Sequence, residues 1–364
     1  MKVNLLLVSF LLSFILLIAF NVSLSDYEFR NLSLGWFNTH YAINYIEFGF
    51  VKRGFIGTFY YFLFDDITQV NLFIFQLFFI VSFIVVSFLF FKKIGMHKNY
   101  IYFLFIISPA TILQFTSDLP RFDVVLVICF MLSLMFVKKS LILFCLFSCI
   151  GVLTHEIYVF SFLPASFLVL INKERTHGNV IPLVIDILKS PAFYFLLSII
   201  LLVVIYGKYE NGYDELLRLF SSKGISVDPN PKGSIHIWTR TIIENIEKTE
   251  NRLSFGHAIY SVIVLSVVLV YLRFLGVDFK NPNYYLILIF SLPMFILGTD
   301  YARWIAFIFI AIFLTFVILE TEKLHSYSKK LPMLASCYGP LGIGGFPSPL
   351  MTKVQAILKQ FMFL

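Results

Sequence analysis

The feature that most constrains this chain is a recurrence of long apolar runs, separated by short segments that hold most of the charge. A helix needs about 20 apolar residues to cross a bilayer. Hydrophobic residues make up 59% of the sequence, whereas a soluble domain has about 45–50%. The pattern therefore predicts an all-α protein, a polytopic bundle of transmembrane helices, and argues against a soluble enzyme with one anchor.

About ten spans can be assigned along the chain. The first apolar run follows a single Lys2. We interpret it as a transmembrane helix rather than a cleaved signal peptide, because it is long and further spans follow. The expected spans cover residues 4–20, 70–91, 100–116, 124–137, 140–154, 157–172, 190–206, 256–273, 284–299 and 304–319.

The basic residues between these runs predict the orientation. They gather at every second helix exit, as expected of the cytoplasmic face of a membrane. Both termini are therefore predicted to be cytoplasmic, and the formal charge of +7 needs no nucleic-acid partner to explain it. The residues concerned are Lys92, Lys93, Lys138, Lys139, Lys173, Arg175, Arg273, Lys280, Lys329 and Lys330.

The predicted domain organisation is one integral membrane domain over residues 1–330, with outer polar segments at about 21–68 and 207–255. Residues 331–364 are expected to form a flexible cytoplasmic tail. They lack a clear span and a GxxxxGK[ST] phosphate-binding motif. The four cysteines form no CxxC pair, so neither a metal site nor a disulfide framework is expected.

The remaining charged groups fall together on the predicted outer side, with all three tryptophans. The hairpins 100–137, 140–172 and 284–319 are too short for two full crossings of about 20 residues each plus a turn. Their charged apices should therefore lie below the outer interface, in one shared, water-filled cavity that opens outward. The charged site residues predicted in this way are Lys52, Arg53, Asp118, Arg121, Asp123, His155, Glu156, Asp300 and Arg303.

Taken singly, each group also has a structural explanation. SDLPRFD (117–123) could be an ion-paired turn, His155-Glu156 a capped helix junction, and Asp300 a helix N-cap. The Lys-Arg pair at 52–53 could anchor the chain at the membrane interface. Ionisable groups inside a membrane are costly unless water, a partner or a ligand meets them. Their convergence on one side therefore favours a site.

Several cations and carboxylates in an outward cavity suit a lipid-linked pyrophosphate. Cations would neutralise the pyrophosphate leaving group, and a carboxylate or histidine would deprotonate an acceptor hydroxyl. No cofactor or metal is expected. The cations Lys52, Arg53, Arg121 and Arg303 are predicted to bind the pyrophosphate. Asp118 or Asp123, together with His155 and Glu156, is predicted to act as the base or to orient it. Asp300 is predicted to position Arg303. Candidate glycan contacts in the outer segment are Tyr209, His236, Trp238 and Arg240.

Four motifs carry a resemblance to known proteins: VKRGFIG (51–57), DLPRFD (118–123), THE (154–156) and DYARW (300–304). With them, most of residues 1–320 resembles the O-antigen polymerase-like proteins of bacterial polysaccharide clusters and related glycosyltransferases that use lipid-linked sugars. The resemblance implies a multi-pass enzyme of the bacterial inner membrane that acts in lipopolysaccharide biosynthesis. It would transfer an undecaprenyl-pyrophosphate-linked glycan to a second lipid-linked unit at the periplasmic face, with membrane lipid and a chain-length regulator protein as further partners.

The sequence departs from the polymerase pattern in having one long late loop, where such polymerases often have two. An early-loop carboxylate of the kind found in lipid-sugar transferases would be Asp26 or Glu28. The alternative function is that of a polysaccharide-related flippase or proton-coupled transporter, which would also need charges in the membrane. The one-sided charges and the lack of an internal repeat favour the glycosyltransferase.

Overall fold

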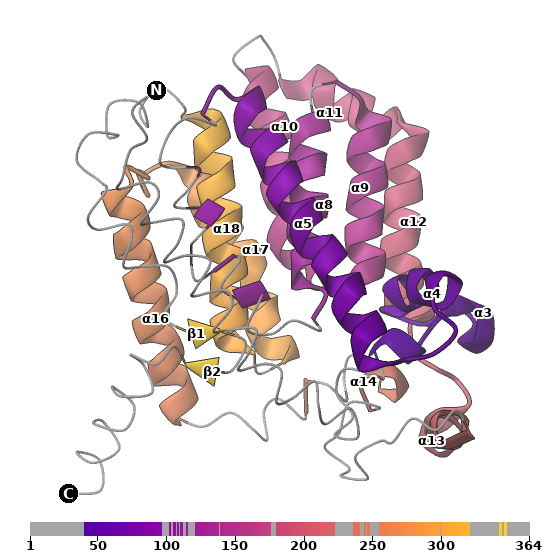
Figure 1. Ribbon diagram of the computed structural model, residues 1–364. Coiled ribbons are helices and arrows are strands. Elements are labelled where there is room, and N and C mark those ends of the chain that lie inside the picture. Colours follow the sequence, from indigo (N-terminus) through magenta and orange to yellow (C-terminus); the bar gives the residue numbers. More distant parts are fainter. Residues whose placement is uncertain are drawn as a thin grey trace, which may run out of the picture.

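Helices account for nearly all the regular structure of the chain, as the computed structural model in Figure 1 shows. The all-α class predicted from the sequence is confirmed, apart from a ribbon with two residues in each strand. The first run 4–20, most of 100–116 and almost all of the tail lie outside the described residues. The structure describes residues 40–96, 102, 105–106, 108, 110–111, 114–115, 121–137, 139–175, 180–222, 236–240, 244, 246–247, 255–298, 300–320, 342–343 and 346–347.

The apolar run 70–91 and all the expected spans after residue 120 are helical, with ends within a few residues of the predicted ones. These long helices are α5 (Gln69–Lys93), α8 (Asp123–Phe136), α9 (Leu141–Thr154), α10 (Tyr158–Arg175), α12 (Pro191–Tyr206), α16 (Phe255–Phe274), α17 (Pro282–Leu297) and α18 (Tyr301–Leu319). The shorter elements are α3 (Tyr45–Phe48), α4 (Gly54–Leu63), α11 (Val180–Lys189), α13 (Gly212–Ser222), α14 (His236–Thr239), and the antiparallel strands β1 (Gly342–Ile343) and β2 (Phe346–Pro347).

Local sequence explains where several of these helices begin. The Ser140 side chain accepts a hydrogen bond from the backbone N–H of Leu143 and so caps α9. Asn281 caps α17 in the same way, and Pro282 then occupies the first helical position, where its missing N–H costs nothing. The polar residues between the apolar runs therefore act as helix boundaries.

Helix α18 lies at the centre of the bundle. Every residue from Arg303 to Val317 is buried, as expected for a helix that is apolar all round. It packs against α10, α16 and α17, while α8 packs against α5, α9 and α10. Since α18 begins at Tyr301, this packing fixes the position of the charged residues at its start.

The two ends of the bundle contain different side-chain contacts. At one end, the Lys93 ammonium donates to the carbonyl of Met135, and the Tyr284 hydroxyl donates to Glu320 (2.7 Å). This end therefore contains the basic turns that follow α5, α8 and α16. The starts of α8, α10 and α18 lie at the other end. The separation agrees with the sequence-based assignment of the two sets of charges to opposite sides.

The outer faces of α5, α12 and α17 are apolar and exposed. Monomeric soluble proteins rarely expose continuous apolar surface on this scale. Among the described residues one helix, Val70–Lys93, is long and apolar enough to cross a membrane by itself, and the other apolar helices are shorter. The exposed side chains include Val70, Ile74, Phe78, Val81 and Val85 on α5, Tyr194, Phe195, Leu201, Val204 and Ile205 on α12, and Tyr285, Ile289, Phe290 and Ile296 on α17.

A second, smaller apolar cluster joins the outer polar segments near α4. Two backbone hydrogen bonds tie it together, from Lys52 N–H to the Gly207 carbonyl (2.9 Å) and from Tyr209 N–H to the Trp238 carbonyl (2.8 Å). Part of segment 207–255 is therefore folded against the chain before α4. The cluster consists of Ala42, Ile43, Phe48, Val51, Tyr209, Leu216, Phe220 and Trp238.

Two of the tryptophans on the predicted outer side are buried in the protein. Trp238 is fully buried in the second cluster. Trp304 is 5% exposed and packs edge-on against Phe295 at 5.6 Å. Both indole rings are held by tertiary packing from distant segments, which local polarity does not report. Trp36 lies outside the described residues.

Candidate functional site

Arg53 and Glu156 form a bidentate ion pair at the end of the bundle away from the basic turns. Arg53 Nε donates to Glu156 Oε2 at 2.9 Å, and Nη2 donates to Oε1 at 2.5 Å. Arg53 immediately precedes α4, and Glu156 lies in the turn between α9 and α10. A two-bond guanidinium–carboxylate fork fixes both side chains in orientation. It therefore brings together two predicted site residues that are far apart in the sequence.

The backbone of Arg53 is strained. Its φ is 62°, in the left-handed region, and it is the only non-glycine residue with positive φ among those that the structure describes. Such a conformation costs about 1–2 kcal/mol for a residue with a Cβ. Strain of this kind persists where surrounding contacts hold it, and it occurs most often at functional sites.

We expect Arg53→Gly to be more stable than Arg53→Ala by about 1 kcal/mol. Both variants lose the guanidinium, but only glycine adopts the left-handed backbone without strain. Unfolding free energies of the two purified proteins in the same detergent measure the difference. Equal values would contradict a left-handed residue at this position.

A second ion-pair network joins the starts of α8 and α18. Asp300 Oδ2 accepts from Arg121 Nη1 at 2.8 Å and from Arg303 Nη1 at 2.5 Å. Arg303 Nε also lies 2.8 Å from Asp123 Oδ2. Asp300 therefore contacts Arg303 directly, as its predicted positioning role requires. Asp123 contacts the same guanidinium through Nε.

Burial within this network increases from Asp300 inward. The Asp300 side chain is 37% exposed, whereas those of Arg303 and Asp123 are 6% and 4% exposed. Gln114 Nε2 donates to Asp123 Oδ2 at 3.1 Å, and Asp123 Oδ1 has no hydrogen-bond partner among the described residues. Asp123 is thus enclosed behind Arg303. Of the two roles that the sequence left open for Asp123, base or orientation of a base, this geometry fits orientation better.

His155 lies between the two networks, at the C-terminal end of α9. Burial lowers its pKa well below the ordinary value and Arg53 acts in the same direction, while Glu156 opposes the shift without reversing it. The imidazole is therefore neutral at pH 7. Its Nδ1 accepts a hydrogen bond from the Ile157 N–H at 3.2 Å and also lies 3.3 Å from Glu156 Oε2. His155 is thus held beside Glu156, and its role as a base or in orienting one stays a prediction.

The two outer carboxylates stay ionised although they are partly buried. Burial raises the pKa of Glu156, but the charge and hydrogen bonds of Arg53 outweigh it and hold that pKa well below its usual range. Burial likewise raises the pKa of Asp300, and Arg121 and Arg303 reverse the effect. Both groups are therefore hydrogen-bond acceptors at neutral pH.

Lys52 connects the second cluster to the bundle. Its Nζ donates to the carbonyl of Arg240 at 3.2 Å, and its backbone N–H donates to Gly207. The side chain is buried, and this burial lowers the pKa of Lys52 to about 8. Lys52 is therefore still a cation at pH 7, but it is enclosed and does not face an open cavity as predicted.

The candidate glycan contacts differ in their placement. Trp238 is buried, with its ring 5.0 Å from that of His40, so it offers no open stacking surface. Tyr209 is nearly buried, and Arg240 is half-buried beside Lys52. Residues Asp26, Glu28 and Asp118 and the side chain of His236 lie outside the part of the chain that the structure describes.

The structure adds one residue to the predicted site. Gln114 contacts Asp123 from within the apolar run 100–116. An amide in an apolar run is the signal that could have identified it, because a buried amide needs hydrogen-bond partners. Sequence reasoning used only the charged residues and so missed it.

The described charges of the site leave an excess of one cation. Lys52, Arg53, Arg121 and Arg303 stand against the carboxylates of Asp123, Glu156 and Asp300. Guanidinium groups bind carboxylate and phosphate oxygens through the same paired N–H donors. The arrangement is therefore suited to an anion that replaces one carboxylate or adds to the cluster.

Comparison with known proteins adds no assignment, because no protein family, curated protein or solved structure matches the chain.

Proposed function

We propose that this protein is an integral membrane glycosyltransferase, an O-antigen polymerase-like enzyme. It would transfer an undecaprenyl-pyrophosphate-linked glycan to a second lipid-linked unit at the periplasmic face of the bacterial inner membrane. The observation that carries the proposal is the convergence of Arg53, Arg121 and Arg303, with three carboxylates, at one end of an apolar helical bundle.

The apolar surface supports a membrane location. Exposed Val, Ile, Leu and Phe side chains cover the outer faces of α5, α12 and α17, and lipid would remove these faces from water. The basic turns after α5, α8 and α16 lie at the opposite end from the charged site. In a bacterial inner membrane the positive-inside rule then places the basic end in the cytoplasm and the site at the periplasmic face.

The lengths of the helices support a site below the outer interface. Helices α8 and α9 each have 14 residues, which corresponds to about 21 Å, against about 30 Å for the hydrocarbon core. With the basic ends at the cytoplasmic surface, the end of α9 and the start of α8 stop short of the outer surface. The ion pairs of Glu156 and Asp123 then lie in a region of low dielectric constant, where a charged leaving group is stabilised strongly.

The proposed reaction is the displacement of undecaprenyl pyrophosphate from the anomeric carbon of the donor sugar. The acceptor hydroxyl oxygen bonds to that carbon, the bond from the carbon to the pyrophosphate oxygen breaks, and the hydroxyl proton passes to a carboxylate. Arg121 and Arg303 are placed to receive the pyrophosphate, with Asp300 exchanging its contacts as the anion binds. We assign Glu156 to accept the proton, because Asp123 is enclosed and Asp300 contacts the arginines that would bind the pyrophosphate.

The test is glycan profiling of a deletion strain complemented with wild type or single variants. We expect the deletion, Arg121→Ala and Arg303→Lys to reduce long-chain glycan at least about tenfold, and single units to remain on the final acceptor. Lysine keeps the charge but loses the paired donors that contact Asp300 and Asp123. Arg218→Ala is the matched control, since Arg218 is an exposed arginine paired only with the nearby Glu215 in the described structure.

Protein levels in the membrane must be equal for this comparison. Unchanged glycan in the deletion strain would exclude the polymerase and leave the transporter as the leading alternative. Normal glycan in both site variants would show that the charged cluster has only a structural role.

A further inference from the structure

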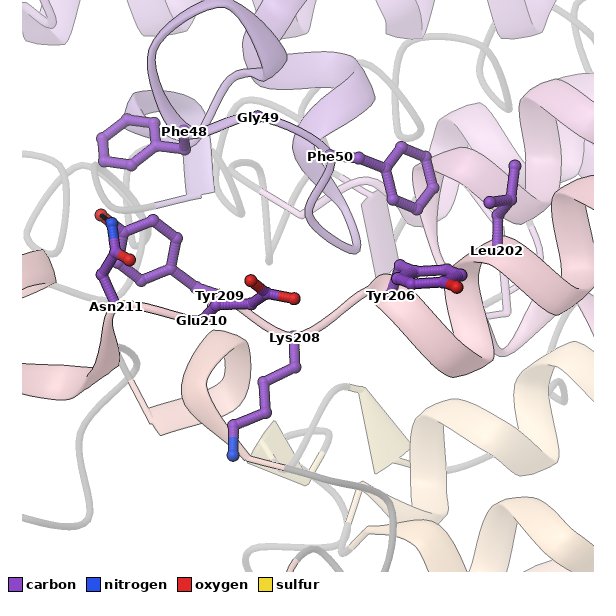
Figure 2. A pocket seen from close by; sticks show the side chains of 9 residues that line it. All are labelled: Phe48, Gly49, Phe50, Leu202, Tyr206, Lys208, Tyr209, Glu210 and Asn211. Carbon is purple, nitrogen blue, oxygen red and sulfur yellow. Dashed lines mark hydrogen bonds between the residues drawn. The ribbon is translucent and has the colours of Figure 1, made fainter.

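A pocket of about 630 Å³ lies beside the charged site, between the turn after α3 and the end of α12 (Figure 2). Its walls come from Phe48, Gly49 and Phe50 on one side and from Leu202, Tyr206 and residues 208–211 on the other. The size is within the range of about 300–1,000 Å³ that is usual for small-molecule sites. None of the residues that carry the proposed reaction lines it.

Two pairs of aromatic rings form the walls of the pocket. Phe50 and Tyr206 lie at one side of the view in Figure 2, and Phe48 and Tyr209 lie at the other. The Phe48 and Tyr209 rings meet edge-on at 6.0 Å, and Tyr209 is fixed by its backbone bond to Trp238. One wall is therefore rigid.

The polar groups in the pocket select for hydroxyl groups over anions. The Glu210 carboxylate points between the two aromatic pairs, and the Asn211 amide lies beside Tyr209. The Lys208 ammonium points away from them. An ionised carboxylate accepts hydrogen bonds from hydroxyl groups and repels a phosphate. Ring faces with such acceptors between them suit the pyranose ring of a sugar.

The pocket also continues an apolar surface. Leu202 and Tyr206 line the pocket and belong to the exposed face of α12. In the membrane this face lies in lipid. A ligand with a sugar head and an apolar chain could therefore place the head among the aromatic rings and the chain along α12.

We propose that this pocket is a second binding site, which holds a sugar ring of a membrane-anchored glycolipid. The inference deepens the proposed function, because it rests on the same membrane placement and assigns a site to one of the two lipid-linked units. The Gly207 carbonyl, between the lining residues Tyr206 and Lys208, accepts a hydrogen bond from the Lys52 N–H. A glycan held in the pocket would thus be close to the Lys52–Arg53 turn.

The test is direct binding to the full-length protein in nanodiscs of zwitterionic lipid. The probes are octyl glycosides of several hexoses, with 1-octanol and octylphosphocholine as ligands of equal chain length without a sugar. Saturation-transfer NMR reports which ligand protons contact the protein, and a titration gives the dissociation constant. We expect at least one glycoside to bind through its sugar protons, and both sugar-free ligands to bind at least about tenfold more weakly.

Variants locate the binding. Tyr206→Ala and Glu210→Ala should each weaken glycoside binding about tenfold. Tyr194→Ala is the matched control, because Tyr194 is a similarly exposed tyrosine of the same helix that does not line the pocket. Equal weakening by Tyr194→Ala, equal binding of octanol, or no binding of any glycoside would each overturn the proposal.

This readout is independent of polymer formation. If the deletion strain makes normal glycan while the glycosides bind as expected, only the enzymatic proposal fails. If the site variants abolish polymer while the glycosides do not bind, only the second site fails.

Discussion

Replacing Arg303 by alanine is expected to destabilise the folded protein by about 3–5 kcal/mol, because removal of one partner leaves a buried charge uncompensated. Asp123 would keep Gln114 as its neighbour but would lose the guanidinium 2.8 Å away. The variant would also lose the contact of that guanidinium with the Phe307 ring, at 5.9 Å. Unfolding free energies from denaturant titrations in mixed micelles measure the loss.

The double variant Asp123→Asn with Arg303→Gln separates stability from function. It removes both charges and keeps side chains that can hydrogen-bond to each other, so we expect its stability to lie within about 1.5 kcal/mol of the wild type. Long-chain glycan should still be absent, because no guanidinium remains on α18 to receive pyrophosphate. If the double variant is no more stable than Arg303→Ala, the loss of stability in Arg303→Ala does not come from an unpaired Asp123. A double variant with normal glycan would exclude Arg303 from the reaction.

Gly57→Ala is expected to destabilise the protein by about 4 kcal/mol or more, near the upper limit for single substitutions. A Cβ at this position would lie 1.8 Å from the Ile43 carbonyl oxygen and 3.1 Å from that of Tyr41. Both atoms belong to the backbone, so no side-chain rotation relieves the clash. Helix α4 would have to move from the segment before α3, and the adjoining turn at Arg53 would move with it.

Gly49→Ala is the matched control for this clash. Gly49 has a φ of 67°, and a Cβ there would meet no heavy atom within 4 Å. The substitution therefore adds backbone strain alone, of about 1–3 kcal/mol, because φ 67° with ψ −163° is a conformation that residues with a Cβ rarely adopt. Denaturant titrations of both variants in the same micelles measure the difference, and similar losses would show that close approach at Gly57 is not the constraint.

The helices could be predicted from the sequence because their signals are local. The run before Lys92 and Lys93 is continuously apolar, and Ser140 and Pro191 mark the starts of the next helices at positions where capping residues and proline are common. The end of the bundle at which each described charged group lies could also be predicted. It follows from counting helices, since each helix reverses the direction of the chain.

The partners of the charged residues could not be predicted from the sequence. Arg53 pairs with a carboxylate 103 residues away, and Arg121 with one 179 residues away. Many other pairings satisfy the same pattern of charges, and only packing around α18 selects among them. The burial of Asp123 behind Arg303 depends on the same packing, so the sequence left open whether this carboxylate acts as a base or orients one.

The burial of Trp238 in the outer segments could not be predicted, for a different reason. Trp238 lies in a polar stretch, and an aromatic residue there is usually interfacial or available to a ligand. Its burial depends on segments before α4 and on α13, which contribute Ile43, Val51 and Phe220 to one cluster. No local property of residues 236–240 reports those distant contacts.

If the protein spans a membrane as we propose, the unequal lengths of its helices have a consequence for the lipid around it. Helix α5 has 25 residues and α9 has 14, a difference of about 16 Å along the axis. Hydrophobic mismatch of this size is met by tilting the long helix and by thinning the bilayer beside the short one. Helix α9 ends at His155, beside the Arg53–Glu156 pair. The thickness of the surrounding membrane therefore becomes a variable that acts on the site without contacting it, and it would sort the protein toward thinner lipid domains.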